Sequence, residues 1–245
     1  MEVSKKIVFI KDWILNYVNS MPKKAESLVI GISGGIDSSV TSTLCAMTGI
    51  KTIVLSMPIK QKHTQHNLSL KHQDWLKKNY NNVESHIIEL DKLFSEFKSS
   101  LSNFDNDHGM ANSRARLRMT TLYQVASSNN GIVVGTGNKI EDFGVGFYTK
   151  YGDGGVDISP IADCNKSEVW ELGKELNLLK EIIDAPPTDG LWDDGRTDES
   201  QLGLTYKELE EAMENEKSIN RDKYLKIRKT SLHKMQQIPV CKIPK

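Results

Sequence analysis

A short apolar run that breaks into glycines, an acid and hydroxyls constrains this chain more than any other segment. Residues 28–32 are predicted to form a buried strand, and residues 38–48 a helix that ends at Gly49. The loop between them, residues 33–39, is Ser-Gly-Gly-Ile-Asp-Ser-Ser. Glycines permit a tight turn, and free N–H groups at a helix N-terminus attract anions. The segment therefore predicts a strand–loop–helix unit that cradles phosphate.

This loop differs from a Walker A loop, because no Gly-Lys-Ser/Thr follows its glycines. Asp37 stands where that lysine would be, which suits a loop that binds phosphate through Mg²⁺. For a bare Gly-Gly turn, the alternative is an ordinary strand-to-helix turn with an Asp or Ser cap. The complete Ser-Gly-Gly-x-Asp-Ser string resembles the pyrophosphate loop of the N-type ATP pyrophosphatases. Those enzymes split ATP between its α and β phosphates to adenylate a substrate.

The composition indicates a globular protein in a reducing compartment. Of the 245 residues, 38% are hydrophobic and 26% are charged, which allows a sizeable core. The 32 basic and 32 acidic side chains cancel, so no global field indicates nucleic acid or a membrane surface as partner. The three cysteines have no metal-binding spacing, and we find neither a signal peptide nor an apolar span. We therefore expect a cytoplasmic protein, in which Cys45 packs in a core helix.

Strand and helix signals alternate along the chain, which predicts an α/β fold with an open parallel sheet flanked by helices, Rossmann-like in class. Further strands are expected at residues 51–57, 83–90 and 131–136. Helices are expected at residues 3–19, 64–79, 112–127 and 220–235, after a cap at Asp91, and after capping boxes that begin at Asn165 and Thr205. No repeat or low-complexity linker interrupts the pattern, so residues 1–245 are expected to form a single domain.

A second motif, Gly-Thr-Gly-Asn-Lys-Ile-Glu at residues 135–141, follows the strand expected at 131–136. Ligands of open parallel sheets bind beyond the carboxyl ends of the strands, where the phosphate loop would also lie. Asp37 and Glu141 could therefore share one Mg²⁺, an ion that prefers oxygen ligands. The alternative is that Glu141 is a solvated loop acid.

A third motif, Thr-Lys-Tyr-Gly-Asp-Gly-Gly-Val-Asp at residues 149–157, suits a flexible lid over a polar substrate, although composition alone favours an exposed turn. The three motifs occur in the order found in NAD synthetases. Asp-Glu-x-x-Leu-Gly follows at residues 198–203, and His233 and Lys234 form a late pair. The resemblance to NAD synthetases spans nearly the whole chain.

The resemblance implies a reaction and its substrates. The carboxylate of nicotinic acid adenine dinucleotide (deamido-NAD) would attack the α-phosphorus of ATP, and ammonia would then displace AMP to leave NAD. The resemblance also implies a homodimer, with the apolar face of the N-terminal helix and part of the helix at 112–128 as candidate interfaces. Glutamine-using members carry an additional amidase domain, for which these 245 residues leave no segment, so free ammonia is the expected nitrogen source.

The resemblance also assigns site residues. The ATP phosphates are expected on Gly31, Ile32, Ser33, Gly34, Gly35, Ile36, Asp37 and Ser38, and other parts of ATP on Thr136, Lys166 and Thr188. Mg²⁺ is assigned to Asp37 and Glu141, with Asp142 as a competitor for the second position. Deamido-NAD is assigned to Arg116, Lys150, Asp157, His233 and Lys234. Asp153 is the candidate to accept a proton from the attacking ammonium.

The sequence is also compatible with two other functions. A different N-type ATP pyrophosphatase, such as GMP synthetase, argininosuccinate synthetase or a tRNA-modifying enzyme, would adenylate another substrate. A nucleotide sensor would bind without turnover, although the acids at positions 37 and 141 argue against it. Because residues two apart on a helix face different ways, at most two of Arg114, Arg116 and Arg118 can contact one ligand, and the arginines other than Arg116 are interpreted as surface charges. Three further side chains are interpreted as surface histidines: His63, His66 and His72.

Overall fold

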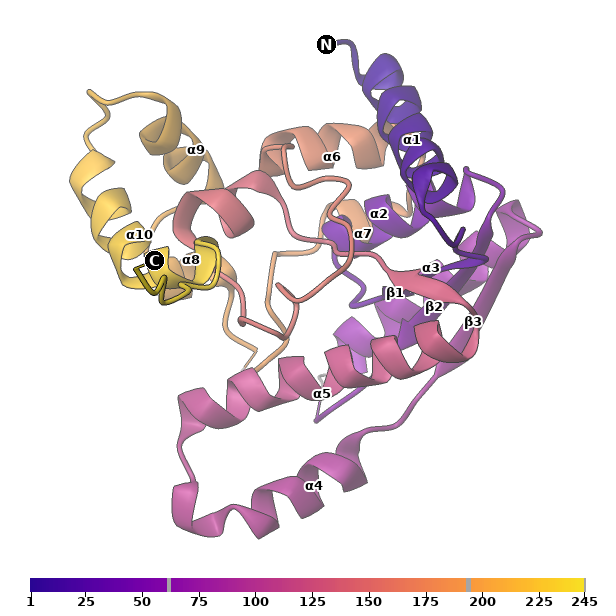
Figure 1. The fold of residues 1–245 in the computed structure, drawn as a ribbon. Coiled ribbons are helices and arrows are strands. Elements are labelled where there is room, and N and C mark those ends of the chain that lie inside the picture. Colours follow the sequence, from indigo (N-terminus) through magenta and orange to yellow (C-terminus); the bar gives the residue numbers. More distant parts are fainter. Residues whose placement is uncertain (61–62, 193–194, 245) are drawn as a thin grey trace.

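A parallel sheet forms the centre of the protein (Figure 1). The computed structural model describes residues 1–60, 63–192 and 195–244. Within them the strands are β1 (Ser27–Gly31), β2 (Lys51–Ser56), β3 (Val83–Ile87) and β4 (Gly131–Val133), and their order across the sheet is β3-β2-β1-β4. All neighbouring pairs are parallel, with Ser27 opposite both Lys51 and Gly131. The predicted open parallel α/β fold is confirmed.

Helices cover both faces of this sheet because side chains alternate along each strand. Leu28 and Ile30 of β1 pack with α1, α2 and α6, whereas Val29 packs with α4 and α5. The helices of the first face are α1 (Val3–Ser20), α2 (Ile36–Ala46), α3 (His63–Asn79), α6 (Lys166–Glu175) and α7 (Lys180–Ile183), and those of the second are α4 (Asp91–Ser100) and α5 (Asp107–Ser128). The strand ends thus open between two helical layers.

Helix α1 packs into the chain's own core. Ile7, Ile10, Ile14 and Val18 lie on one face and are all buried against the first layer. This apolar face is therefore not available to a second copy of the chain, contrary to its expected place in a dimer interface. Its opposite side remains exposed, including Trp13.

A third group of elements lies on one side of the molecule, away from α1 and β3 (Figure 1). We call it the C-terminal cluster: the π-helical turn η2 (Ile140–Val145) and helices α8 (Asp198–Leu202), α9 (Tyr206–Glu214) and α10 (Arg221–Met235). Its buried core includes Ile140, Leu209 and Tyr224. This cluster carries the motif that follows β4 and brings it beside the sheet.

Several boundaries differ from the sequence prediction. Helix α5 begins at Asp107, before the expected residue 112, because Asn106 caps it by accepting a hydrogen bond from Gly109 N at 2.8 Å. Asp91 was expected to cap α4, but it is the first residue of that helix, and its carboxylate accepts a bond from Lys60 N at 2.6 Å. Strands β3 and β4 are shorter than expected. The Thr205 capping box is confirmed at α9.

Candidate active site

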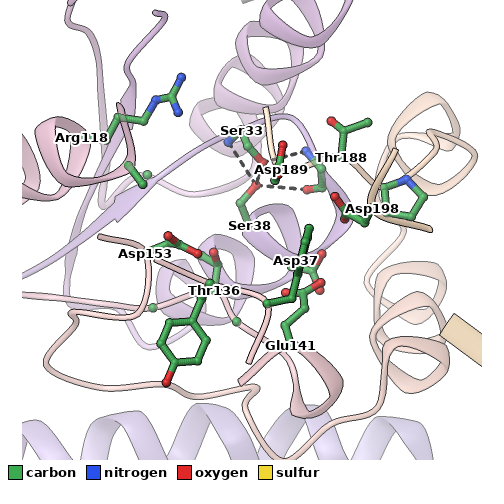
Figure 2. A pocket seen from close by; sticks show the side chains of 18 of the residues that line it. Ser33, Asp37, Ser38, Arg118, Thr136, Glu141, Asp153, Thr188, Asp189 and Asp198 are labelled. Carbon is green, nitrogen blue, oxygen red and sulfur yellow. Dashed lines mark hydrogen bonds between the residues drawn. The ribbon is translucent and has the colours of Figure 1, made fainter. Parts of the chain in front are cut away.

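One pocket opens at the carboxyl ends of the strands (Figure 2). It lies between the loop after β1, helix α5, the segment after β4 and the residues before α8. Nearly all of the residues expected to contact ATP line it: Gly31, Ile32, Ser33, Gly35, Ile36, Asp37, Ser38, Thr136, Lys166 and Thr188. Glu141, Asp142 and Asp153 line it as well, and Gly34 is the expected ATP residue that does not. Motifs separated by more than a hundred residues thus meet at one edge of the sheet.

The loop after β1 is held open by its own hydroxyl groups. Ser38 Oγ donates to Gly35 O at 3.1 Å and accepts from Ser33 N at 3.3 Å. Gly34 adopts φ 89°, a left-handed conformation that a side chain would disfavour. Because the helix α2 starts at Ile36, its N-terminal N–H groups point into the pocket region. The loop is therefore shaped for an anion before one binds.

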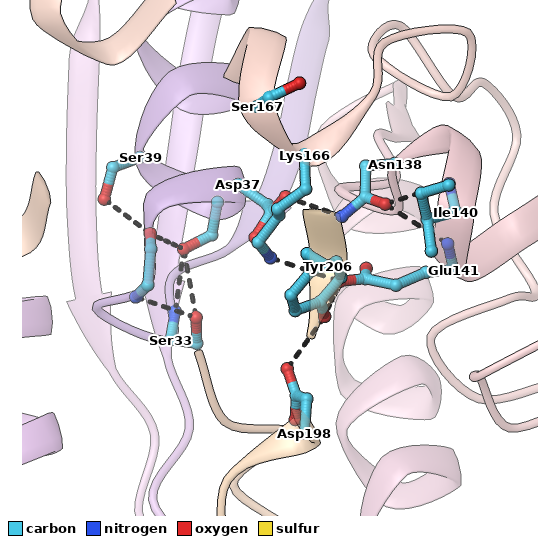
Figure 3. Close-up of polar contacts among 12 residues, drawn as sticks. Ser33, Asp37, Ser39, Asn138, Ile140, Glu141, Lys166, Ser167, Asp198 and Tyr206 are labelled. Atoms are coloured by element: carbon cyan, nitrogen blue, oxygen red, sulfur yellow. Dashed lines mark hydrogen bonds and ion pairs between the residues drawn. The ribbon is translucent and has the colours of Figure 1, made fainter. Parts of the chain in front are cut away.

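Lys166 joins this loop to the C-terminal cluster (Figure 3). Its side chain is 1% exposed, and its Nζ lies 2.6 Å from Asp37 Oδ2 and 3.2 Å from Glu141 Oε1. Burial alone would lower the pKa of Lys166, but the two carboxylates outweigh burial and raise it. A positive charge therefore bridges the two acids that the sequence motifs predicted to meet.

Asn138 contacts the side chain of Asp37 and the backbone of Glu141. Its Nδ2 donates to Asp37 Oδ1 at 3.0 Å, and its Oδ1 accepts from Ile140 N at 3.1 Å and Glu141 N at 3.2 Å (Figure 3). The side chain is fully buried, so these bonds satisfy an amide that burial would otherwise penalise. The Asn of the Gly-Thr-Gly-Asn-Lys motif therefore fixes the start of η2 against the phosphate loop.

The two carboxylates fit a hard divalent cation, because they already converge on one positive charge. Within the described part of the chain, no group of three or more His, Cys, Asp or Glu side chains is arranged to hold a metal ion. A metal here would therefore complete its shell with phosphate oxygens and water. Asp142 also lines the pocket, but its carboxylate lies against Gly137, where an added Cβ would be 2.3 Å from its Oδ1, whereas the Glu141 carboxylate contacts Lys166. This placement favours Glu141 over Asp142 as the partner of Asp37.

The expected lid is attached to α5 at its base. Thr149 Oγ1 donates to Asn112 Oδ1 at 2.6 Å, and Thr149 N donates to Asp153 Oδ1 at 3.0 Å. The side chain of Asp153 remains exposed towards the pocket, yet the surrounding protein raises the pKa of its carboxyl to about 6, chiefly by desolvation. A carboxyl with such a pKa can exchange a proton near neutral pH.

Comparison with known proteins assigns the family. Residues 6–242 match the family model described as NAD synthase. The chain belongs to the NAD synthase family. An "NH(3)-dependent NAD(+) synthetase" of Alkaliphilus metalliredigens is 34% identical, and the match covers 99% of this chain and all of the relative.

Two solved structures of similar length share the fold. One, titled as NMN synthetase from Francisella tularensis, superposes with a TM-score of 0.85 at 34% identity and covers 98% of this chain and 97% of its own. The other, an NH3-dependent NAD synthetase from Campylobacter jejuni, has a TM-score of 0.79 at 25% identity and covers 99% and 100%. The family and fold predicted from the motifs are therefore confirmed.

The five residues that the NAD synthetase resemblance assigned to deamido-NAD lie outside the lining of this pocket. Arg116 and Lys150 meet on the outer side of α5, where Arg116 Nε donates to Lys150 O at 3.2 Å. Asp157 accepts bonds from Tyr123 Oη at 3.1 Å and from Val133 N at 2.7 Å.

The remaining two deamido-NAD residues lie at the end of α10. His233 is exposed there, and Lys234 donates to the carbonyls of Gly146 and Tyr148. The structure therefore brings Arg116 and Lys150 together, keeps His233 and Lys234 as a pair on α10, and places Asp157 beside Tyr123 and β4.

Neither of the two arginines interpreted as surface charges is exposed in this NAD synthase fold: Arg114 is buried and Arg118 is half-buried. Arg114 donates to Leu191 O at 3.1 Å and stacks over the Phe94 ring. Arg118 lines the pocket opposite Glu141 (Figure 2), and its Nε donates to Met57 O at 3.0 Å. Burial and the Arg114 charge lower the pKa of Arg118 to about 10. Arg114 and Arg118 are four residues apart in α5 and therefore lie on the same face of the helix, which turns towards the interior.

The interpretation of His72 as a surface histidine is also wrong. His72 is fully buried behind the phosphate loop, with its Nε2 2.9 Å from Ser42 Oγ, and burial lowers its pKa to about 4. Its spacing within α3 places it towards the sheet. His66 is half-buried, and the side chain of His63 lies outside the described residues. Cys45 is buried as expected, and burial raises its pKa.

Two site residues gave no individual signal in the sequence. Tyr206 lies 65 residues from Glu141, yet its Oη reaches that carboxylate. Asp198 also lines the pocket. It belongs to the Asp-Glu-x-x-Leu-Gly motif, which indicated the family but gave no role to this residue. No helix within the described residues is both long and apolar enough to cross a membrane.

Proposed function

We propose that this chain amidates deamido-NAD to NAD with ammonia and ATP, through an adenylated carboxylate, releasing AMP and pyrophosphate. The observation that carries the proposal is the bridge of Lys166 to Asp37 and Glu141 beside the phosphate loop. In this geometry the negative charge that develops on the leaving pyrophosphate would be stabilised by the N–H groups of the loop and by the ammonium group of Lys166. The similarity to NH3-dependent NAD synthetases supports the choice of substrate.

We propose that Asp37 and Glu141 hold Mg²⁺ together with the phosphates of ATP. When bound, this ion would neutralise charge on the leaving pyrophosphate. Lys166 is buried between the same acids, so it would turn towards a phosphate oxygen while keeping a hydrogen bond to one acid. Asp153 would accept the proton that ammonium loses.

The adenosine end of ATP would lie between the strand ends and α5. Thr136 and Thr188 line this part, and Arg118 adds a positive charge there. We propose that residues 1–245 form one catalytic domain. The three free cysteines support a cytoplasmic location.

We propose that the dinucleotide extends from the pocket over the outer side of α5 and that a homodimer completes its site. An open groove beside Arg116 and Lys150 is lined by Tyr123 and Tyr151, which could stack against a base. Lys234 lies on α10 and donates to the carbonyl of Tyr148, and in the proposed dimer a second copy would complete the site for the dinucleotide.

The decisive experiment incubates the purified protein with labelled ATP, ammonia and a panel of acids, and measures AMP and pyrophosphate. We expect both products with deamido-NAD and little with the acceptor substrates of GMP or argininosuccinate synthetases. Turnover with another acceptor would replace the proposed substrate, and binding of ATP without turnover would indicate a sensor.

A mononucleotide substrate is the second candidate, because the structure titled NMN synthetase superposes at a TM-score of 0.85. The mononucleotide lacks the adenylate half, so it would not need the groove beside Tyr123. The two substrates should therefore be compared by kcat/KM under identical conditions. We expect deamido-NAD to be preferred, and a clear preference for the mononucleotide would make NMN the product.

The nitrogen source can be tested in the same assay. We expect activity with ammonia to increase with pH as the NH₃ fraction increases, and glutamine to support no more turnover than its contaminating ammonia. Robust NAD formation from glutamine, with free ammonia scavenged, would contradict this part of the proposal.

A further inference from the structure

The Asp-Glu-x-x-Leu-Gly motif folds into a short element that places two side chains near the site. Thr197 Oγ1 accepts from Ser200 N at 3.2 Å and starts α8 at Asp198, and Gly203 ends it with φ 70°. Glu199 Oε1 then accepts from Tyr206 N at 3.0 Å, at the first residue of α9. This compact turn brings Asp198 and Tyr206 face to face.

Tyr206 connects this turn to the acid of η2 (Figure 3). Its Oη lies 2.6 Å from Glu141 Oε1, the same oxygen that Lys166 contacts, and 3.0 Å from Asp198 Oδ2. The ring is 1% exposed and packs edge-on against Trp170, with Lys166 Nζ 4.6 Å from its centre. The hydroxyl is therefore fixed by packing on all sides.

The hydroxyl has one proton and two carboxylates within reach. A phenol carries its proton at neutral pH, so Tyr206 enters both contacts as the hydrogen-bond donor. One proton makes one strong bond at a time. Glu141 Oε1 and Asp198 Oδ2 are thus alternative acceptors for the same phenol proton, and the shorter contact is the one to Glu141.

A second buried tyrosine in the C-terminal cluster shows what a purely structural role looks like. Tyr224 is 3% exposed, and its Oη donates to the carbonyl of Gly144 at 3.2 Å. A backbone acceptor would satisfy Tyr206 equally well if packing were its only role. Instead, Tyr206 reaches a carboxylate that faces the pocket.

We propose that Tyr206, held by Asp198, is a positioning residue that orients Glu141 for the metal–nucleotide complex. Hydrogen bonds to the carboxylates that bind a metal typically set its affinity. The inference rests on the proposed function, because Glu141 is a metal ligand only there. It gives the Asp-Glu-x-x-Leu-Gly motif a physical role, which is to carry the group that fixes Glu141.

The test measures Mn²⁺ binding by electron paramagnetic resonance, with α,β-methylene-ATP as the unreactive nucleotide. We expect Tyr206→Phe to weaken Mn²⁺ affinity about 10-fold, because it removes one hydrogen bond to a ligand. Tyr224→Phe is the matched control, since it removes a buried phenol that touches no pocket acid, and its affinity should equal that of the wild type. Unchanged affinity in Tyr206→Phe, or an equal loss in Tyr224→Phe, would overturn the inference.

A second variant covers the case in which Tyr206→Phe does not fold. Asp198→Asn keeps the shape of the side chain but removes its charge. We expect it to lower the Mn²⁺ affinity less than Tyr206→Phe does and to raise the KM for ATP. Wild-type affinity and KM in this variant would contradict the role of Asp198. Failure of the wild-type protein to bind Mn²⁺ with the nucleotide would instead refute the metal site of the proposed function.

Discussion

The pocket has two sides that are built in different ways. The phosphate loop after β1 is local: Ser33, Gly35 and Ser38 bond one another within six residues. The opposite side is assembled from η2, α6, α8 and α9, where Glu141, Lys166 and Tyr206 meet over long sequence separations. A local loop can form as soon as its strand and helix do, whereas the acid side requires the C-terminal cluster to dock. We infer that catalysis depends on that docking.

If both sides act on one cation, removing either acid should have the same large effect. We expect Asp37→Asn to lower pyrophosphate release at least about 100-fold, because a lost oxygen ligand and charge cost several kcal/mol at the transition state. Glu141→Gln should lose a similar amount. The double variant should lose little more than either single one, since residues that act as a unit are not additive.

Asp163→Asn is the control for these variants. Its carboxylate is 98% exposed and pairs only with Lys139 among the described residues. It should retain wild-type pyrophosphate release. Pyrophosphate release near the wild-type rate in Asp37→Asn, or additive losses in the double variant, would contradict the claim that Asp37 and Glu141 act on one cation.

Lys166 is the link between the sides, so its removal should affect stability as well as activity. We expect Lys166→Met to lower the free energy of unfolding by about 2–3 kcal/mol in the absence of Mg²⁺, because two half-enclosed carboxylates lose their shared counter-charge. Added Mg²⁺ should restore part of this loss. Urea unfolding with and without Mg²⁺ measures both effects.

Lys139→Met provides the comparison for that experiment. Lys139 pairs with an exposed acid, so its removal should change the free energy of unfolding by no more than about 0.5 kcal/mol. Equal stability of Lys166→Met and the wild type without metal would mean that the bridge does not hold the two sides together.

The phosphate-loop side should respond to acid through His72. Its pKa is lowered to about 4 in the folded protein, against an ordinary value of 6.5, so the unfolded chain binds the proton first. Stability is therefore highest above about pH 6.5 and falls as the pH decreases towards 4. We expect His72 to account for at most about 2 kcal/mol of loss between pH 7 and pH 5.

Comparison of His72→Gln with the wild type isolates this contribution. The variant should lose less free energy of unfolding between pH 7 and pH 5 than the wild type does. His108→Gln, which changes an exposed histidine, should follow the wild type. If the free energy of unfolding depends on pH in the same way in the wild type and in His72→Gln, His72 is not a buried neutral histidine in the folded protein.

The smallest effect is expected at the cap of α9. Thr205 Oγ1 accepts from Glu208 N at 3.3 Å at the start of the helix that begins with Tyr206. Thr205→Ala should lower the free energy of unfolding by about 1 kcal/mol. The KM for ATP should increase slightly if α9 orients the acid side. A changed kcat with unchanged stability would indicate a different role.

The same contrast explains what the sequence could predict. The strand–loop–helix unit at β1 and α2, the parallel sheet and the Thr205 capping box follow from short-range patterns, and all are confirmed. The contact of Lys166 with Asp37 spans 129 residues, and only a family resemblance pointed to Lys166 at all. Tyr206 had no local signal, because a tyrosine at a helix start is ordinary until its partner is known.

The misassigned side chains have a similar cause. Arg114, Arg118 and His72 were interpreted by charge, which favours the surface, although their helical positions face the sheet. Arg114 and His72 are buried and Arg118 is half-buried, because their polar atoms find partners there: Leu191 O for Arg114, Met57 O for Arg118 and Ser42 Oγ for His72. Burial of a polar residue depends on a partner from elsewhere in the chain, and a single sequence does not show which partner will be near.

Transfer of oxygen from the substrate to AMP tests the central claim most directly. Deamido-NAD labelled with ¹⁸O in its nicotinate carboxylate would be turned over with ATP and ammonia, and the AMP analysed by mass spectrometry. Attack of the carboxylate on the α-phosphorus, followed by displacement by ammonia, leaves one carboxylate oxygen on AMP. We predict one ¹⁸O in each AMP formed. Unlabelled AMP produced alongside NAD would contradict adenylation at this site.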